Sequence, residues 1–142
     1  MTQQILCAVD LTDPEDGQKL ITEAHKLAKF YEAKLSAVTV LPDYGSSWVG
    51  SFFKDGTLKE ASVKALEALH ELVDAAISEP HKVQCIVEIG KAYEEILHAQ
   101  KTIDADLIVM GAHRPDLPDR ILGPNVSRVV RHAEASVMVL RV

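Results

Sequence analysis

The sequence contains no apolar run long enough to cross a membrane, and its opening residues lack the pattern expected of a secretory leader. Its longest apolar runs have about the length of a β-strand, far below the ~20 residues that a membrane-spanning helix needs. The first residues carry no basic segment, and Asp10 ends the first apolar run before it reaches signal-peptide length. We therefore expect a cytoplasmic protein without a membrane span.

Cysteine is scarce, and its positions exclude the usual uses of paired cysteines. Only Cys7 and Cys85 are present, each inside a short apolar run, and no Cys-x-x-Cys or paired Cys/His spacing occurs. A disulfide framework and a cysteine-bound metal are therefore not expected. Both cysteines are predicted to be buried, reduced thiols.

Basic residues are too few to balance the acidic ones, with 15 Lys and Arg against 21 Asp and Glu and a formal net charge of −6. Such a chain repels a phosphate backbone, so nucleic acid is not an expected partner. The 142 residues, 47% of them hydrophobic, suffice for one core, and no repeat or low-complexity segment divides them. We predict one domain that spans residues 1–142.

Short runs rich in β-branched residues alternate along the chain with segments whose apolar residues recur at helical spacing. Some of these runs are apolar throughout, which is typical of strands that are buried on both faces of a sheet. Because strands and helices alternate, right-handed crossovers and parallel strands are expected. We predict an α/β fold: a single doubly wound, five-stranded parallel sheet with helices on both faces. The predicted strands are Gln4–Val9, Lys34–Leu41, Lys82–Ile89, Asp106–Met110 and Ser136–Val142.

Start and stop residues delimit the helical patterns. Asp13 is a suitable N-cap and Pro14 suits the first helical position, so the first helix is predicted to begin there. Pro80 is predicted to close the longest helix. The apolar stripes of the predicted helices cover Leu20–Tyr31, Leu58–Ala76, Ile96–Ile103 and Val126–Ala133.

The predicted fold itself indicates where a ligand would bind. In a doubly wound sheet, ligands bind beyond the carboxyl ends of the strands, where the strand order reverses. Three segments follow strands at that edge, namely Val9 to Asp13, Leu41 to Gly45, and Gly111 to Asn125. These segments are the candidate binding regions.

The segment from Gly111 to Asn125 has the features of a phosphate cradle. Gly111 ends a buried strand and Gly123 opens a helix, so backbone amides and a helix N-terminus can face an anion. Arg114 and Arg120 would add charge-assisted contacts. The same pattern also fits an ordinary strand-to-helix connection, and both interpretations stay open.

Asp10 is the second candidate for a ligand contact. A carboxylate at the end of the first strand can accept hydrogen bonds from a ribose hydroxyl or an adenine amine. The alternative is that Asp10 only caps the loop that precedes the first helix.

The motifs of common hydrolases and kinases are missing. The sequence has no Gly-x-Ser-x-Gly, no Gly-x-x-x-x-Gly-Lys-Ser/Thr and no His-Glu-x-x-His. Of the six histidines, only His113 falls in a candidate binding region, and no nucleophile is paired with it. A single histidine is not a catalytic constellation, so at most slow ATP hydrolysis is expected and no metal site is predicted.

At the segments just described, the sequence resembles the universal stress protein family over essentially its whole length. The nucleotide-binding branch of that family carries Gly-x-x-Gly, nine residues, and then Gly-Ser or Gly-Thr, and here Gly111 matches the first glycine and Gly123 the last. The other stretches that carry the resemblance are Ala8-Val9-Asp10, Val38-Thr39-Val40, Val87-Glu88-Ile89-Gly90, Ala105-Asp106-Leu107-Ile108-Val109-Met110 and Ser136-Val137-Met138-Val139-Leu140-Arg141.

The loop departs from the family pattern in ways that remove phosphate contacts. Arg114 replaces the second glycine, the stretch that follows is one residue shorter, and Pro124 stands where the pattern has serine or threonine. Proline offers neither a hydroxyl nor an N–H donor. The loop is similar to that of a small bacterial subgroup with His-Arg-Pro-Asp at this place, here 113–116, in which Arg114 would supply the missing contact by its charge.

The resemblance implies a strand order of 3-2-1-4-5 and a role for each matching residue. Asp10 would contact the adenosine and Val40 would line the adenine pocket. Gly111 would pass beneath the ribose and phosphates, and the segment from Gly123 to Val126 would cradle the phosphates, with Ser127 as a further hydroxyl. The complete set of expected nucleotide contacts is Ala8, Asp10, Val40, Gly111, His113, Arg114, Gly123, Asn125, Val126 and Ser127.

Three functional hypotheses follow. The first is a stress-response regulator that binds ATP, ADP or AMP, with or without Mg²⁺, and thereby alters its association with a protein partner not identified by the sequence. The second is a dimeric interaction protein of the same fold with an empty pocket. The third is a small hydrolase or transferase that uses His113 and Asp10. The resemblance also implies a homodimer through Ser136–Val142, and this apolar, unguarded edge agrees with it.

Overall fold

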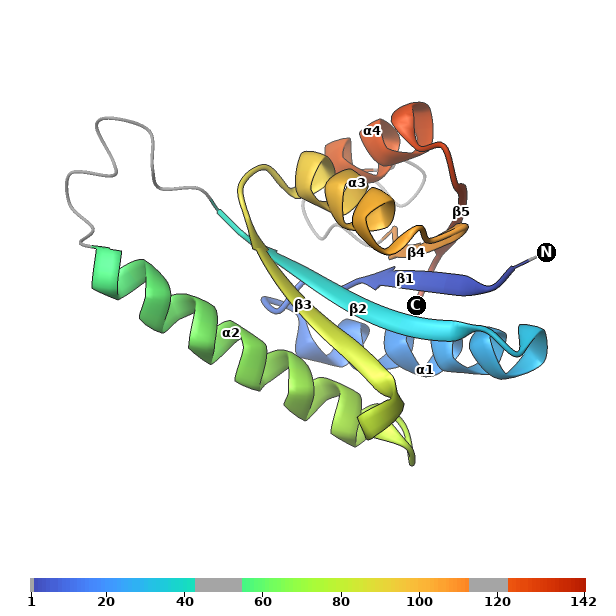
Figure 1. Ribbon diagram of the computed structural model, residues 1–142, viewed down its shortest axis with the longest axis horizontal. Coiled ribbons are helices and arrows are strands. Elements are labelled where there is room, and N and C mark those ends of the chain that lie inside the picture. The colour runs from blue at the N-terminus through green and yellow to red at the C-terminus, as the bar shows by residue number, and fades with distance from the viewer. Residues whose placement is uncertain (1, 43–54, 113–122) are drawn as a thin grey trace.

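The computed structural model describes residues 2–42, 55–112 and 123–142 (Figure 1). Within these ranges the chain forms five strands, four α-helices and one short 3-10 helix. Their order is β1 (Gln4–Ala8), α1 (Pro14–Tyr31), β2 (Lys34–Leu41), α2 (Asp55–Ala76), η2 (Pro80–Lys82), β3 (Val83–Ile89), α3 (Ala92–Ile103), β4 (Leu107–Gly111), α4 (Pro124–His132) and β5 (Ser136–Leu140).

The five strands form one parallel sheet with the order β3-β2-β1-β4-β5. β1 lies at the centre, where Ile5 pairs with Leu35 of β2 on one side and with Leu107 of β4 on the other. The chain runs outward from β1 through β2 to β3 and then crosses back to β4 and β5. The predicted fold class and strand order are confirmed, and the reversal of strand order lies between β1 and β4.

Helices cover both faces of the sheet, in two pairs (Figure 1). α1 and α2 pack on one face, where Ile21 and Leu69 meet strand residues such as Val109 in a first apolar cluster. α3 and α4 pack on the other face, where Ile96 and Val129 join a second cluster. Alternate residues of one strand enter opposite clusters because successive side chains of a strand point to opposite faces. This arrangement explains why the central strands read as continuous apolar runs.

The start of α1 is as the sequence predicts. Asp13 occupies the N-cap position, its Oδ1 accepts a hydrogen bond from the amide of Asp16 at 3.3 Å, and Pro14 is the first helical residue. The carboxylate satisfies one of the amides that a helix start leaves without a partner. α1 therefore begins at a position set by local chemistry, and that position is at the carboxyl edge of the sheet.

Some predicted boundaries differ from the observed ones. α2 ends at Ala76, and Pro80 begins the 3-10 helix η2 instead of closing α2. Lys82 belongs to η2, so β3 begins one residue later than predicted. β5 ends at Leu140, because the ladder with β4 stops at the pair Gly111 and Leu140. The end of a strand depends on the length of the strand beside it. The local sequence carries no information about that neighbour.

The two thiols have different environments. Cys7 is fully buried on β1, and burial raises the pKa of its thiol to about 12. Cys85 is only half-buried, contrary to the prediction, because β3 is an edge strand of the sheet. Burial and the nearby carboxylate of Asp74 raise the pKa of Cys85 to about 11. Both cysteines are free, as predicted.

The described ranges, 2–42, 55–112 and 123–142, contain four α-helices. None of the helices there is both long enough and apolar enough to cross a bilayer.

Candidate functional site

A pocket of about 480 Å³ lies at the carboxyl edge of the sheet. It spans the ends of β1, β2 and β4, which include the point where the strand order reverses. The first turns of α1, α3 and α4 complete its walls. Its lining comprises Ala8, Val9, Asp10, Thr12, Asp13, Asp16, Gly17, Leu20, Val38, Val40, Ala92, Ile96, Met110, Gly111, Ala112, Gly123, Asn125, Val126 and Val142.

The pocket brings together most of the residues that the sequence singled out. Those at its lining are Ala8, Asp10, Val40, Gly111, Gly123, Asn125 and Val126. Ser127 is different: it is exposed on α4, its amide donates to the carbonyl of Gly123, and it does not line the pocket. His113, Arg114 and Arg120 lie outside the described residues, as does the segment from Trp48 to Phe53. Their roles stay predictions.

Asp10 is held in a tight turn at the mouth of the pocket. Its Oδ1 accepts hydrogen bonds from the amide of Thr12 at 2.9 Å and from the hydroxyl of Thr12 at 2.7 Å. The carboxylate therefore does cap the loop before α1, which was one of the two alternatives. Its other oxygen has no hydrogen bond to any residue that the structure describes, so one acceptor stays available to a ligand.

The N-terminus of α4 forms one wall of the pocket. Gly123 is the N-cap, Pro124 is the first helical residue, and the amide of Ser127 makes the first helical hydrogen bond, to Gly123. Proline has no N–H, so Asn125 and Val126 are the two residues whose amides have no partner within the helix. No acidic residue stands in this first turn. The partial positive charge of this helix end is therefore available to an anion.

The N-terminus of α1 lies on the same pocket but has the opposite electrostatic character. Asp13 and Asp16 both line the pocket and are partly buried. With Asp10, they place three carboxylates on the α1 side. The sequence analysis treated Asp13 and Asp16 only as helix-start residues. The signal was present, because a helix that starts at the carboxyl edge of the sheet must present its first turn to the binding region.

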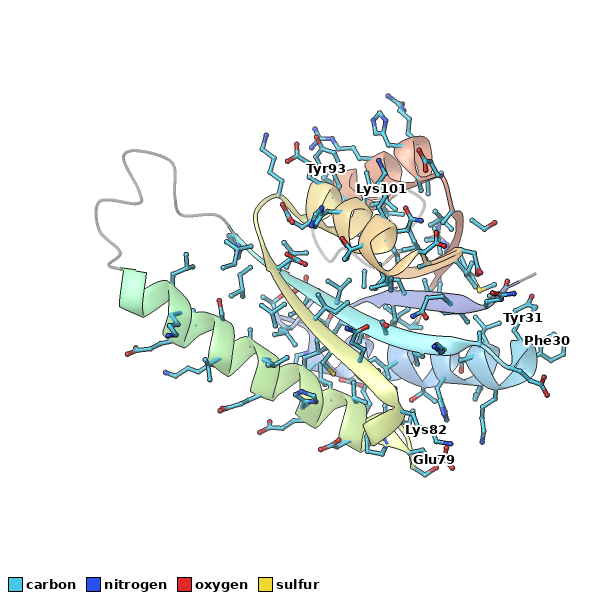
Figure 2. The ribbon with its side chains drawn as sticks, in the orientation of Figure 1. Phe30, Tyr31, Glu79, Lys82, Tyr93 and Lys101 are labelled. Atoms are coloured by element: carbon cyan, nitrogen blue, oxygen red, sulfur yellow. The ribbon has the colours of Figure 1, made fainter. Side chains whose placement is uncertain are left out.

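α3 supplies an apolar wall and is tied to α4. Ala92 and Ile96 line the pocket, and neither was predicted to do so. Tyr93, at the start of α3 (Figure 2), lies under the guanidinium group of Arg128 on α4, 5.0 Å from the centre of its ring. This cation–π contact joins the first turn of α3 to α4. The α4 wall and the α3 wall of the pocket are therefore linked.

The described part of the lining consists of apolar residues, glycines, carboxylates and few other polar side chains. It contains no histidine, cysteine, serine, lysine or arginine, and Thr12 is its one hydroxyl residue. Among the described residues, no group of three or more His, Cys, Asp or Glu is placed to hold a metal ion. The one hydroxyl and carboxylate of this lining in hydrogen-bond contact are those of Thr12 and Asp10, at 2.7 Å, and this contact belongs to the turn that precedes α1.

The fold and the pocket define a doubly wound α/β protein with a pocket at the reversal of strand order. The sequence profile described as the Universal stress protein family matches residues 1–141. The chain therefore belongs to the universal stress protein family.

Individual relatives agree with this assignment. Universal stress protein G of Shigella flexneri is 28% identical over 143 residues, which cover 99% of this chain and 100% of that protein. The solved structure of universal stress protein UspA from Lactobacillus plantarum superposes with a TM-score of 0.77 at 29% identity, covering 99% of this chain and 98% of that one. The universal stress protein from Archaeoglobus fulgidus in complex with dAMP has a TM-score of 0.68 at 18% identity, with 98% of each chain covered, and shares the fold. The subgroup with His-Arg-Pro-Asp at 113–116 stays a prediction.

Proposed function

We propose that this universal stress protein binds an adenine nucleotide in the pocket between β1 and β4, and that occupancy regulates its association with other proteins in the cytoplasm during stress. One observation carries the proposal. The tips of β1 and β4 and an acid-free helix N-terminus line a single pocket, as Asp10, Gly111, Gly123 and Asn125 show. The pocket thus has a carboxylate on one side and free helix amides on the other. The carboxylate can accept hydrogen bonds from a sugar, and the amides can donate hydrogen bonds to a phosphate.

The size and lining of the pocket support a nucleotide. Its volume, about 480 Å³, lies within the roughly 300–1,000 Å³ of typical small-molecule sites. Val38, Val40 and Ile96 provide apolar surface for a planar base. The dAMP complex of the Archaeoglobus fulgidus protein supports the choice of adenine, since that protein shares the fold.

Thermal unfolding of the purified chain with and without adenine nucleotides tests the proposal. A ligand at about 100 times its Kd stabilises the folded state by about 2.7 kcal/mol, so at least one of ATP, ADP and AMP should raise the Tm by several degrees. Val40→Glu, which places a charge in the apolar part of the pocket, should abolish the shift.

Val63→Glu is the matched control, because Val63 is 51% exposed on α2 and does not line the pocket. This variant should keep the full shift. If no adenine nucleotide moves the Tm of the unaltered chain, the proposal fails, and the second hypothesis, an interaction protein with an empty pocket, takes its place.

We also propose that the protein is a homodimer that pairs through the edge formed by β5. Apart from Ser136, the residues of this strand are apolar and only half-buried, namely Val137, Met138, Val139 and Leu140. A second copy would cover this surface and protect the open edge of the sheet.

A further inference from the structure

The two helices on the first face of the sheet differ in how their surface charges are paired. On α1, Glu15 pairs with Lys19 at 3.7 Å, and Glu23 pairs with Lys26 at 3.0 Å, each distance joining Oε1 to Nζ. On α2, no carboxylate lies within ion-pair distance of a lysine or arginine that the structure describes. α1 therefore neutralises part of its own charge, whereas the carboxylates of α2 face solvent without a partner among the described residues.

The outward face of α2 is acidic and partly apolar. Val63 is 51% exposed and Leu66 is 36% exposed. Four exposed carboxylates recur on this face at intervals of three, four or seven residues, so they share one side of the helix with Val63. Only two lysines, Lys59 and Lys64, accompany them, and the face keeps a formal charge of −2. The four carboxylates are those of Glu60, Glu67, Glu71 and Asp74.

The outward face of α4 has the opposite charge. The helix contains no aspartate or glutamate, and Arg128, Arg131 and His132 are all exposed. Arg128 lies over the ring of Tyr93, a contact that does not neutralise its charge. Neither arginine forms an ion pair with a carboxylate that the structure describes. Val130, which is 48% exposed, adds apolar surface to this face.

The acidic face and the basic face cannot meet within one chain. α2 packs on one side of the sheet and α4 on the other (Figure 1). Two copies can bring them together, and the chain itself thus supplies a surface of matching charge for each face. Both faces also carry exposed valine, whose removal from water favours a contact.

We propose that copies of this chain associate head to tail, with the acidic face of α2 in one copy packed on the basic face of α4 in the next. α2 lies over β2 and β3 and α4 lies beside β5, so successive copies are staggered. Such a contact joins two different surfaces and leaves one of each free at the ends, so further copies can add. It uses neither β5 nor the side chains that line the pocket.

The net charge of −6 opposes association at long range, and salt separates this repulsion from the local attraction. At about 0.1 M salt the Debye length is about 10 Å, and a chain of this size has a radius of gyration of about 14 Å, so the centres of touching copies are about three Debye lengths apart. Their repulsion is then screened, while carboxylate and guanidinium groups in contact still attract. At about 1 M salt the Debye length is about 3 Å and the attraction is screened as well.

Sedimentation velocity of the full chain, from micromolar to millimolar concentration, tests the proposal. In about 0.1 M NaCl the sedimentation coefficient should rise with concentration, and in about 1 M NaCl it should not. A dimer through β5 buries apolar residues and should survive the higher salt, so the association that salt abolishes belongs to α2 and α4. A sedimentation coefficient that does not rise with concentration at the lower salt would overturn the proposal.

Charge reversal tests the two faces directly. Arg131→Glu on α4 and Glu67→Lys on α2 should each weaken association roughly fivefold or more, because attraction between exposed charges becomes repulsion. An equimolar mixture of the two variants should associate again. In the mixture, the reversed α2 of one variant meets the reversed α4 of the other, and the two unaltered faces still match.

Two controls reproduce the changes in net charge elsewhere on the surface. Lys34→Glu matches Arg131→Glu, and Glu32→Lys matches Glu67→Lys, since both control positions are exposed and lie outside α2 and α4. The controls should associate like the unaltered chain, and circular dichroism should show every variant folded. If the mixture stays dissociated, or if the controls weaken association as much as the variants do, the proposal is wrong. Nucleotide binding is unaffected by that outcome, because none of these four residues lines the pocket.

Discussion

Gly90 shows how a single residue shapes the wall of the pocket. It joins β3 to α3 with a φ of +151°, a conformation that side-chain-bearing residues rarely adopt. Its amide donates to the carbonyl of Leu41 at 2.9 Å, which fixes the end of β3 against β2. A Cβ atom at this position would lie 2.8 Å from Oε1 and 2.9 Å from Cγ of Glu95. The backbone conformation therefore favours glycine, and a larger residue would also have to displace the side chain of Glu95.

Substitution of Gly90 separates these two requirements. Gly90→Ala should lower the free energy of unfolding by about 1–3 kcal/mol, the usual cost of a strained backbone conformation, as measured by urea denaturation. Glu95→Ala in the same chain removes the close contact but leaves φ unchanged, so only part of the loss should return. Full recovery in the double variant would contradict a role for the backbone conformation.

At the scale of the element, α1 is the helix whose start matters most to the site. Its N-cap, Asp13, sets where the helix begins, and the first turn then carries Asp16 and Gly17 to the pocket. Gly17 fits closely there, because an added Cβ would lie 3.0 Å from Cγ1 of Val9. The helix start and the shape of the pocket are therefore set together.

Loss of the cap should destabilise α1 in a way that a charge change alone does not. Asp13→Ala should lower the free energy of unfolding by about 1 kcal/mol, whereas Asp13→Asn, which retains an oxygen acceptor, should lose only a few tenths of that. Urea titrations followed by circular dichroism provide the measurement. An equal loss in both variants would show that the charge, and not the hydrogen bond to Asp16, stabilises the helix.

At the scale of the whole molecule, the sheet has two open edges, β3 and β5. The proposed dimer uses β5, so Val139→Lys should give a monomer in sedimentation velocity while circular dichroism still shows a folded chain. Ile89→Lys is the control at the other edge, since Ile89 is a 36% exposed apolar residue on β3. It should leave the dimer intact. A monomeric unaltered chain, or a dimer lost only through Ile89→Lys, would contradict pairing through β5.

Local patterns predicted individual residues of the site well where they also set secondary structure. Gly111 and Gly123 were identified because a strand ends at one and a helix opens after the other, and both line the pocket. Ala92 and Ile96 were not identified as site residues, because nothing near them in sequence distinguishes a pocket wall from a core-facing helix. Ser127 was expected from the family pattern, but the turn of α4 places it outside the lining.

The sequence by itself determined which segments form strands and helices, because that choice depends mostly on neighbours a few residues away. β2 was predicted with its observed bounds Lys34–Leu41, and Asp13 with Pro14 marked the start of α1. The alternation of those elements was enough to predict a parallel sheet, while the order of its strands came from the family resemblance. Only the tertiary structure decided that the first turns of α1, α3 and α4 share one pocket, with the carboxylates on the α1 side and the free amides on the α4 side. That arrangement depends on contacts between residues about a hundred positions apart, such as those that place β4 beside β1, and local patterns contain no information about such distances.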